Sequence, residues 1–72
     1  MTKEEKLKIL AEAMDVEIDV LVDEAALSSF DEWDSLAALS LMSLLSSKLH
    51  KKITPAEVKA IDTVSDALNL ME

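Results

Sequence analysis

The sequence predicts an all-α fold: a four-helix bundle with three longer helices, one short helix and a long loop between the first and second helices. Glycine is absent and Pro55 is the one proline in 72 residues, a composition that favours helices over turn-rich β structure. Half of the residues are hydrophobic, yet Phe30 and Trp33 are the only aromatic ones, which predicts an aliphatic core. Helix-start signals recur along the chain, each ahead of apolar residues at helical spacing.

The first helix is expected to begin after Thr2. Thr2 and Glu5 have the spacing of a capping box, in which a hydroxyl and a carboxylate each accept a hydrogen bond from a free backbone N–H. Residues three and four positions apart lie on one side of a helix, so an apolar set at that spacing is expected to face the core. This set is Leu7, Leu10, Ala11 and Met14.

The segment from Asp15 to Trp33 is too long for a simple turn. Its aliphatic residues are compatible with a strand, but a lone strand has no partner; they are Val16, Ile18, Val20, Leu21 and Val22. We therefore expect an ordered loop whose aliphatic side chains pack on the helices, with room for a short helical turn near Asp23–Leu27.

The longest helix is expected from about Ser35 to Leu49, with Asp34 as its N-cap. Lys48, Lys51 and Lys52 lie near its other end, where cations interact favourably with the helix dipole. At 100° per residue, one face should point into the core: Ala38, Leu41, Met42, Leu45 and Leu49. The outer face is then Ala37, Ser40, Ser43, Ser46 and Ser47, flanked by Leu39 and Leu44.

Two further helices are expected at the C-terminal end. Thr54 and Glu57 form a second capping-box pattern around Pro55, which is tolerated at the first helical position because no N–H is needed there. Val58 and Ile61 supply the apolar face of this short helix. The pair Thr63 and Asp66 predicts the start of the last helix, whose apolar residues are Val64, Ala67, Leu68 and Met71.

Charge and composition exclude several function classes. The formal net charge is −8, so we expect no binding to nucleic acid or to anionic membrane. A basic protein partner is the natural complement, and the alternative is that the acidity only keeps the domain soluble. Cysteine is absent and His50 is the one histidine, which excludes a zinc cluster within one chain. No calcium-loop pattern is present either, so no metal site is expected. Eight acids and no Lys or Arg fall between Asp15 and Asp34: Asp15, Glu17, Asp19, Asp23, Glu24, Asp31, Glu32 and Asp34.

Membrane insertion is not expected. No apolar run approaches the ~18 residues of a membrane span, and the first residues, MTKEEKLK, lead into an amphipathic pattern rather than an apolar signal core. A chain without cysteine also fits a reducing compartment. We therefore expect a cytoplasmic, monomeric protein that consists of one domain over residues 1–72.

The tripeptide Asp34-Ser35-Leu36 opens the longest predicted helix directly after the acidic loop. With the aliphatic spacing that follows, Ile53 before the short helix and Ile61 before the last one, the whole chain resembles the acyl carrier protein family. The resemblance implies a bundle of the acyl carrier type and a 4′-phosphopantetheine, derived from coenzyme A, on Ser35. It also implies that Asp34 helps to engage the phosphopantetheinyl transferase. Leu36 could be buried or could make a surface contact beside the arm, and by helical phase it lies away from the core face, which favours the contact.

No catalytic residue is expected. A serine nucleophile needs an adjacent base, and His50 lies at the far end of the predicted helix from Ser35. The resemblance implies instead a carrier that holds acyl or aminoacyl groups as thioesters on the arm. Its partners would be the transferase, an acyl- or aminoacyl-loading ligase and a downstream transferase or synthase. The alternative is a non-carrier helical interaction module in which Ser35 is a mere helix-start residue.

The outer face of the central helix departs from the usual family pattern. Fatty-acid carriers of the common kind have carboxylates there, whereas this face is neutral, and the glycine common shortly before the motif is replaced by Glu32. The sequence thus resembles specialised discrete carriers of secondary metabolism or cell-envelope decoration more than a general fatty-acid carrier. Partner docking is expected at Asp31, Glu32, Leu39, Ser40 and Ser43.

Overall fold

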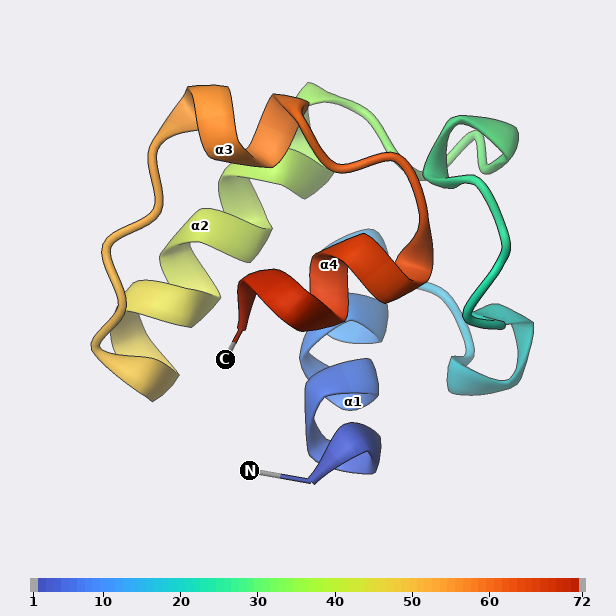
Figure 1. Cartoon of the computed structure of the whole chain (residues 1–72), viewed down its shortest axis with the longest axis horizontal. Coiled ribbons are helices and arrows are strands. Elements are labelled where there is room, and N and C mark those ends of the chain that lie inside the picture. Colours follow the sequence, from blue (N-terminus) through green and yellow to red (C-terminus); the bar gives the residue numbers. More distant parts are fainter. Residues whose placement is uncertain (1, 72) are drawn as a thin grey trace.

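In the computed structural model, which describes residues 2–71, the chain folds into four α-helices joined by loops and two short 3-10 turns (Figure 1). The helices are α1 (Lys3–Met14), α2 (Ser35–Leu49), α3 (Pro55–Lys59) and α4 (Val64–Leu70). Within the described residues there is no β-strand. The predicted all-α bundle, with its long loop between the first and second helices, is confirmed.

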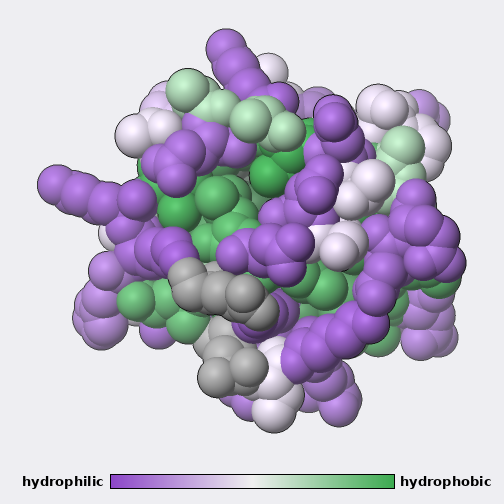
Figure 2. All heavy atoms as spheres, in the orientation of Figure 1, coloured by the Kyte–Doolittle hydropathy of each residue, from purple (hydrophilic) through white to green (hydrophobic). Residues whose placement is uncertain are grey.

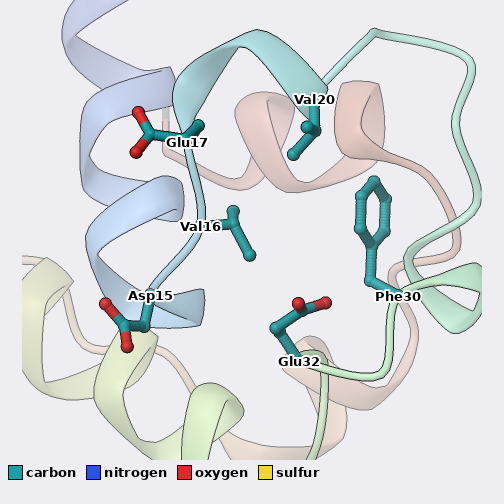
Figure 3. Close-up of a pocket in the computed structure, with 6 residues that line it drawn as sticks. All are labelled: Asp15, Val16, Glu17, Val20, Phe30 and Glu32. Atoms are coloured by element: carbon teal, nitrogen blue, oxygen red, sulfur yellow. The ribbon is translucent and has the colours of Figure 1, made fainter.

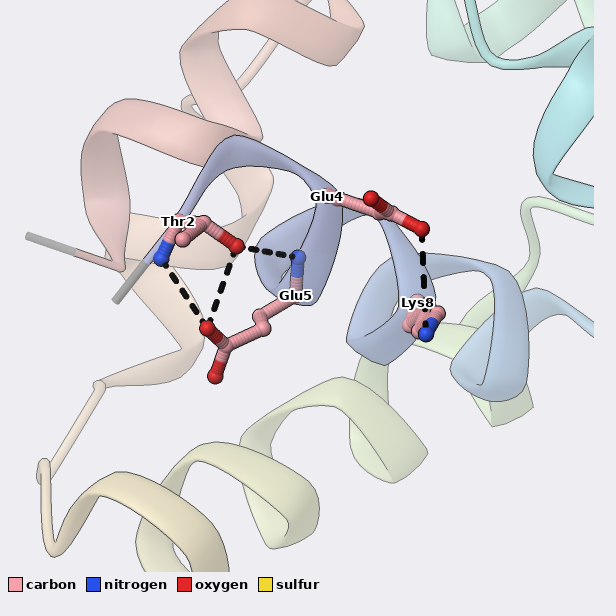
Figure 4. A network of polar contacts seen from close by, with 4 residues as sticks. All are labelled: Thr2, Glu4, Glu5 and Lys8. Carbon is pink, nitrogen blue, oxygen red and sulfur yellow. Dashed lines mark hydrogen bonds and ion pairs between the residues drawn. The ribbon is translucent and has the colours of Figure 1, made fainter.

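The helices begin at the predicted caps. At α1 the Glu5 amide donates to the Thr2 hydroxyl over 3.2 Å and the Thr2 amide donates to the Glu5 carboxylate over 3.4 Å (Figure 4). The bonds that the Thr2 amide and the Thr2 hydroxyl donate to the Glu5 carboxylate lower the pKa of Glu5. Capping boxes also open α3 and α4, while α2 is capped by Asp34 alone. Short-range sequence patterns therefore set where each helix begins.

Two helix ends use a left-handed residue that is not glycine. Asp15 ends α1 with φ 58°, and His50 ends α2 with φ 53°. Glycine is the usual residue at such positions because it lacks a Cβ, and this chain has none. Asp and His are among the residues that tolerate this region best. The amide of His50 donates to the carbonyl of Leu45, so this histidine is part of a helix stop.

The core is aliphatic, as predicted, and all four helices contribute to it. α2 crosses α1 on one side and contacts α3 on the other. Its buried line is Ala37, Leu41 and Leu45, whereas Ala38, Met42 and Leu49 are half-buried at the edge of the core. The prediction that Ala37 lies on the outer face is wrong. The helix packs closely enough against α1 for this small side chain to be 4 % exposed.

The segment between α1 and α2 is an ordered loop. Its 3-10 turns lie at Ile18–Val20 and Leu27–Ser29. The helical turn for which the sequence left room near Asp23–Leu27 therefore starts only at Leu27, and a simple turn occupies residues 23–24. The loop is fixed by backbone bonds to α4 and to the residues before it. These are Leu27 N–H to Asp62 O at 2.8 Å, Val64 N–H to Ala25 O at 3.0 Å and Ser65 N–H to Asp23 O at 3.0 Å.

Side chains complete this attachment. Lys3 on α1 forms an ion pair with Asp23 at 2.6 Å, and Leu21 and Leu27 are buried in the core. Trp33 is half-buried against the same core. Ile61, expected on the short helix, lies beyond the end of α3 and packs on the core from there. The loop thus arrives at the start of α2 in one defined path.

Candidate functional site

Ser35 is the first residue of α2 and its side chain is exposed. The preceding Asp34 has an extended backbone, and its carboxylate accepts a hydrogen bond from the Ala37 amide at 2.9 Å. The hydroxyl of Ser35 has no hydrogen-bond partner among residues 2–71. Asp34 therefore performs the capping, and the serine oxygen next to it stays available for chemistry.

The electrostatics at this position favour an anion. The first amides of a helix have no partner within the helix, and the aligned peptide dipoles place roughly half a positive charge at this end. Asp34 occupies the Ala37 amide, and its carbonyl accepts from Ala38 at 3.0 Å. The amides of Ser35 and Leu36 are the first two of the helix. A phosphoryl group on the Ser35 oxygen would meet them directly.

A groove runs beside Ser35 between α2 and α3. Its volume is about 220 Å³ and most of its lining is apolar. The lining residues are Ser35, Ala38, Leu39 and Met42 of α2, and Pro55, Val58 and Lys59 of α3. An arm attached to Ser35 can extend over this groove without displacing a buried side chain. The residues present therefore fit a phosphopantetheine group.

Two leucines flank the serine and face solvent. Leu36 is 73 % exposed and Leu39 is 59 % exposed, which confirms that Leu36 points away from the core. Leu36 borders a second hollow of about 280 Å³ toward α1, which also includes Asp34, Ser40 and Glu32. Leu39 borders the groove toward α3. The start of α2 is thus an apolar ridge with a hollow on each side.

The predicted docking residues all have exposed side chains: Asp31, Glu32, Leu39, Ser40 and Ser43. Asp31 and Glu32 approach from the loop, and the other three belong to α2. Figure 2 shows how hydrophilic residues cover much of one face of the molecule, with smaller hydrophobic areas between them.

The sequence reasoning missed a third hollow, of about 400 Å³, where the loop leaves α1. Val16, Val20 and Phe30 surround it, and Glu32 lies at its edge (Figure 3). Asp15 and Glu17 complete its lining. The signal available in the sequence was the aliphatic residue Val20 in a segment rich in acids. Val20 and Phe30 do not belong to one helix or strand, so their spacing in the sequence does not predict that they lie close together; the fold brings them to the same hollow.

The one histidine of the chain lies far from Ser35. His50 lies at the opposite end of α2 from Ser35, so the imidazole is not placed to remove the serine proton. Within residues 2–71, no group of three or more His, Asp or Glu side chains is arranged to hold a metal ion. Nor does any described helix have the length and apolar content to cross a membrane.

Comparison with known proteins agrees with this geometry. The family described as "phosphopantetheine attachment site" matches residues 7–71, nearly the whole chain. The search of curated proteins found no match. The matched region includes the start of α2 and both hollows beside it.

Proposed function

Because the chain belongs to the phosphopantetheine attachment site family, whose members are non-catalytic carriers, we propose that Ser35 is the residue that bears the 4′-phosphopantetheine. The family assignment makes this chain a carrier protein with a covalent arm, which a phosphopantetheinyl transferase attaches. Partner enzymes then load and unload intermediates as thioesters on the arm. The attachment position is the part that the proposal adds.

The observation that carries the proposal is the free hydroxyl of Ser35 at the amide end of the longest helix. The phosphodiester formed there is stabilised by the helix dipole. Other exposed serines lack this setting: Ser40 and Ser43 lie within α2, and the Ser29 hydroxyl already donates to the Ala26 carbonyl at 2.6 Å. Within this arrangement Asp34 orients the start of the helix and presents one carboxylate to the transferase.

We further propose that partners dock on the ridge formed by Leu36 and Leu39 and on the neutral serines Ser40 and Ser43. The exposure of both leucines supports this assignment, because exposed apolar side chains gain free energy when a partner covers them. Acidic recognition is confined to the loop, at Asp31, Glu32 and Asp34.

A neutral docking helix suits a specialised carrier of acyl or aminoacyl groups in lipid or secondary metabolism, acting as a cytoplasmic monomer of one domain. Residues 1 and 72 of that domain lie outside the described structure.

The attachment is tested with coenzyme A and a broad-specificity phosphopantetheinyl transferase. Intact mass should rise by one phosphopantetheine per chain, and peptide mapping should place it on Ser35. Ser35→Ala should take up none and keep its helical circular dichroism, while Ser46→Ala, a matched change at an exposed serine of α2 outside the docking residues, should be modified like the wild type. Modification of the Ser35→Ala variant, or none of the wild type, would favour the alternative in which Ser35 is a helix-start residue alone.

A further inference from the structure

We propose that Lys59 is a positioning residue for the arm: its ammonium group binds the phosphodiester on Ser35 and directs the arm over the groove between α2 and α3. This inference rests on the proposed attachment at Ser35. It concerns a residue of α3 that lies 24 positions further along the chain, so the juxtaposition is a product of the fold.

The groove brings Lys59 and Ser35 together. Lys59 is the last residue of α3 and Ser35 the first of α2, and both line the same hollow of about 220 Å³. Of the residues that line it, Lys59 alone carries a charge. Its side chain is exposed, and among residues 2–71 it has no ion-pair or hydrogen-bond partner. Its ammonium group is therefore available to a ligand.

A phosphodiester on Ser35 would be stabilised by such a cation. It carries a negative charge and would sit next to Asp34, at the end of a segment with eight acids and no Lys or Arg. The helix dipole supplies about half a positive charge and acts within the first turn. A lysine provides a full charge on a flexible stem with three donors, and Lys59 is the cation that faces this groove.

The expected effect is modest and depends on salt. Exposed ion pairs shift an equilibrium by about two- to fivefold, so Lys59 should bias the arm toward α3 rather than immobilise it. Salt at 1 M shortens the screening length to about 3 Å and should remove most of the bias. Salt does not screen contacts between the arm and the apolar side chains of Leu39, Met42 and Val58. A bias that came from these contacts alone would therefore persist at 1 M salt.

The test compares the apo protein with the modified protein by NMR. Attachment of the arm should perturb the backbone amides of Val58, Lys59 and Ala60. In the modified protein, the phosphorus resonance of the arm should shift as salt is added. In Lys59→Gln these α3 perturbations should fall by at least half, and Lys59→Arg should restore them. Lys52→Gln removes the same charge from an exposed position outside the groove and should behave like the wild type.

Intact mass and peptide mapping of each sample keep the two proposals apart. A chain that accepts no arm, or accepts it elsewhere, overturns the attachment at Ser35 and this inference with it. An arm on Ser35 with equal α3 perturbations in wild type and Lys59→Gln, or equal losses in Lys52→Gln, overturns the role of Lys59 and leaves the attachment intact. Because Lys59 is exposed and unpaired, the substitutions should leave the melting temperature unchanged.

Discussion

Two adjacent residues at the start of α2 have separate tasks. Asp34 satisfies the Ala37 amide at 2.9 Å and thereby fixes the helix start. Ser35 follows it with an exposed, unbonded hydroxyl. A serine cap would have tied up the nucleophilic oxygen, whereas an aspartate cap leaves that oxygen free. The order Asp-Ser is therefore chemically meaningful, since the reverse order would place the capping carboxylate inside the helix.

Asp34 is expected to contribute both stability and recognition. Asp34→Ala removes the cap and should lower the free energy of unfolding by about 1 kcal/mol, or roughly 4–8 °C in a chain of this size. Asp34→Asn retains an accepting oxygen and should unfold like the wild type, yet be modified more slowly by the transferase. Thermal unfolding and initial rates of arm transfer measure the two effects. Equal rates for Asp34→Asn and wild type would show that the charge plays no part in recognition.

Asp66 makes the start of α4 sensitive to acid. Its carboxylate accepts from the backbone amides of Asp62 at 3.1 Å and Thr63 at 3.2 Å, and these bonds lower its pKa from the ordinary 3.8. A lowered pKa means that the ionised group stabilises the fold. This contribution is complete above pH 3.8 and is lost as the pH falls through the lowered value.

Asp66→Asn should therefore melt a few degrees below the wild type at pH 7, and the gap should close as the pH falls below 3.8. Melting temperatures between pH 7 and pH 2.5 measure it. Asp62→Asn is the matched control, because the Asp62 carboxylate accepts no hydrogen bond within residues 2–71. A gap for Asp66→Asn that is independent of pH would mean that the carboxylate charge is not what stabilises the cap.

At the scale of elements, α2 presents three different sides. Leu41 and Leu45 are fully buried, Met42 lines the groove toward α3, and Leu36 and Ser40 border the hollow toward α1. The helix is mostly apolar or neutral along its length, and Lys48 is its one charged residue. Lys48 pairs with Glu12 of α1 at 3.7 Å. The charge-free part of the helix is the part nearest the serine, where a partner would approach the arm.

Leu39 is expected to be an anchor for partners. Leu39→Ala should weaken transfer to the cognate loading enzyme about fivefold or more, with little change in melting temperature because the side chain is 59 % exposed. Val22→Ala is the control: Val22 is similarly exposed, at 51 %, but lies in the loop away from the serine. Steady-state kinetics of the arm-bearing variants measure the effect. Equal losses for Leu39→Ala and Val22→Ala would argue against a docking ridge.

Adding charge to the neutral face of α2 should produce a gain of recognition, in contrast to the loss expected for Leu39→Ala. Ser40→Glu combined with Ser47→Glu should improve recognition by fatty-acid synthesis enzymes, which expect carboxylates on this helix in the resemblance described above. Both serines are exposed, so the change should not disturb the core. The comparison offers wild type and the double variant to the same enzymes. If these enzymes already use the wild-type protein as well as they use their own carrier, the neutral face does not determine specificity, and the proposal of a specialised role fails.

For the whole molecule, the acids are concentrated in one region. Eight of the fifteen acids lie between Asp15 and Asp34, in a loop that backbone hydrogen bonds hold against α4. The ion pair of Lys3 with Asp23 offsets part of this charge. The remaining carboxylates repel one another in the folded state, and the unfolded chain separates them.

The melting temperature should therefore rise with added salt, because ions screen the repulsion over about 10 Å at 0.1 M. Millimolar magnesium should raise it further by accumulating at the acidic loop. A variant with Asp19→Asn and Glu24→Gln, two exposed positions, should melt higher than the wild type at low salt and respond less to both titrations. A wild-type melting temperature that is flat in both would show that the acids are spaced well enough not to repel.

The helix starts and the candidate serine were predictable because they depend on neighbours three or four residues apart. Thr2 with Glu5, Thr54 with Glu57, and Thr63 with Asp66 each form their cap within one turn. Asp34 likewise reaches an amide three residues away. Such contacts are available to any chain with these residues, so the sequence by itself determined where the helices begin and which serine stands at the start of the longest one.

Tertiary structure decided what depends on residues far apart in the chain. The turns of the loop lie at Ile18–Val20 and Leu27–Ser29 because Leu21 and Leu27 must reach the core while the backbone pairs with α4. Ala37 is buried because α1 packs against that side of α2. The helical periodicity of α2 alone does not say which of its sides another helix will cover. The groove that brings Lys59 beside Ser35 exists for the same reason: packing, not local pattern, sets which helix faces meet.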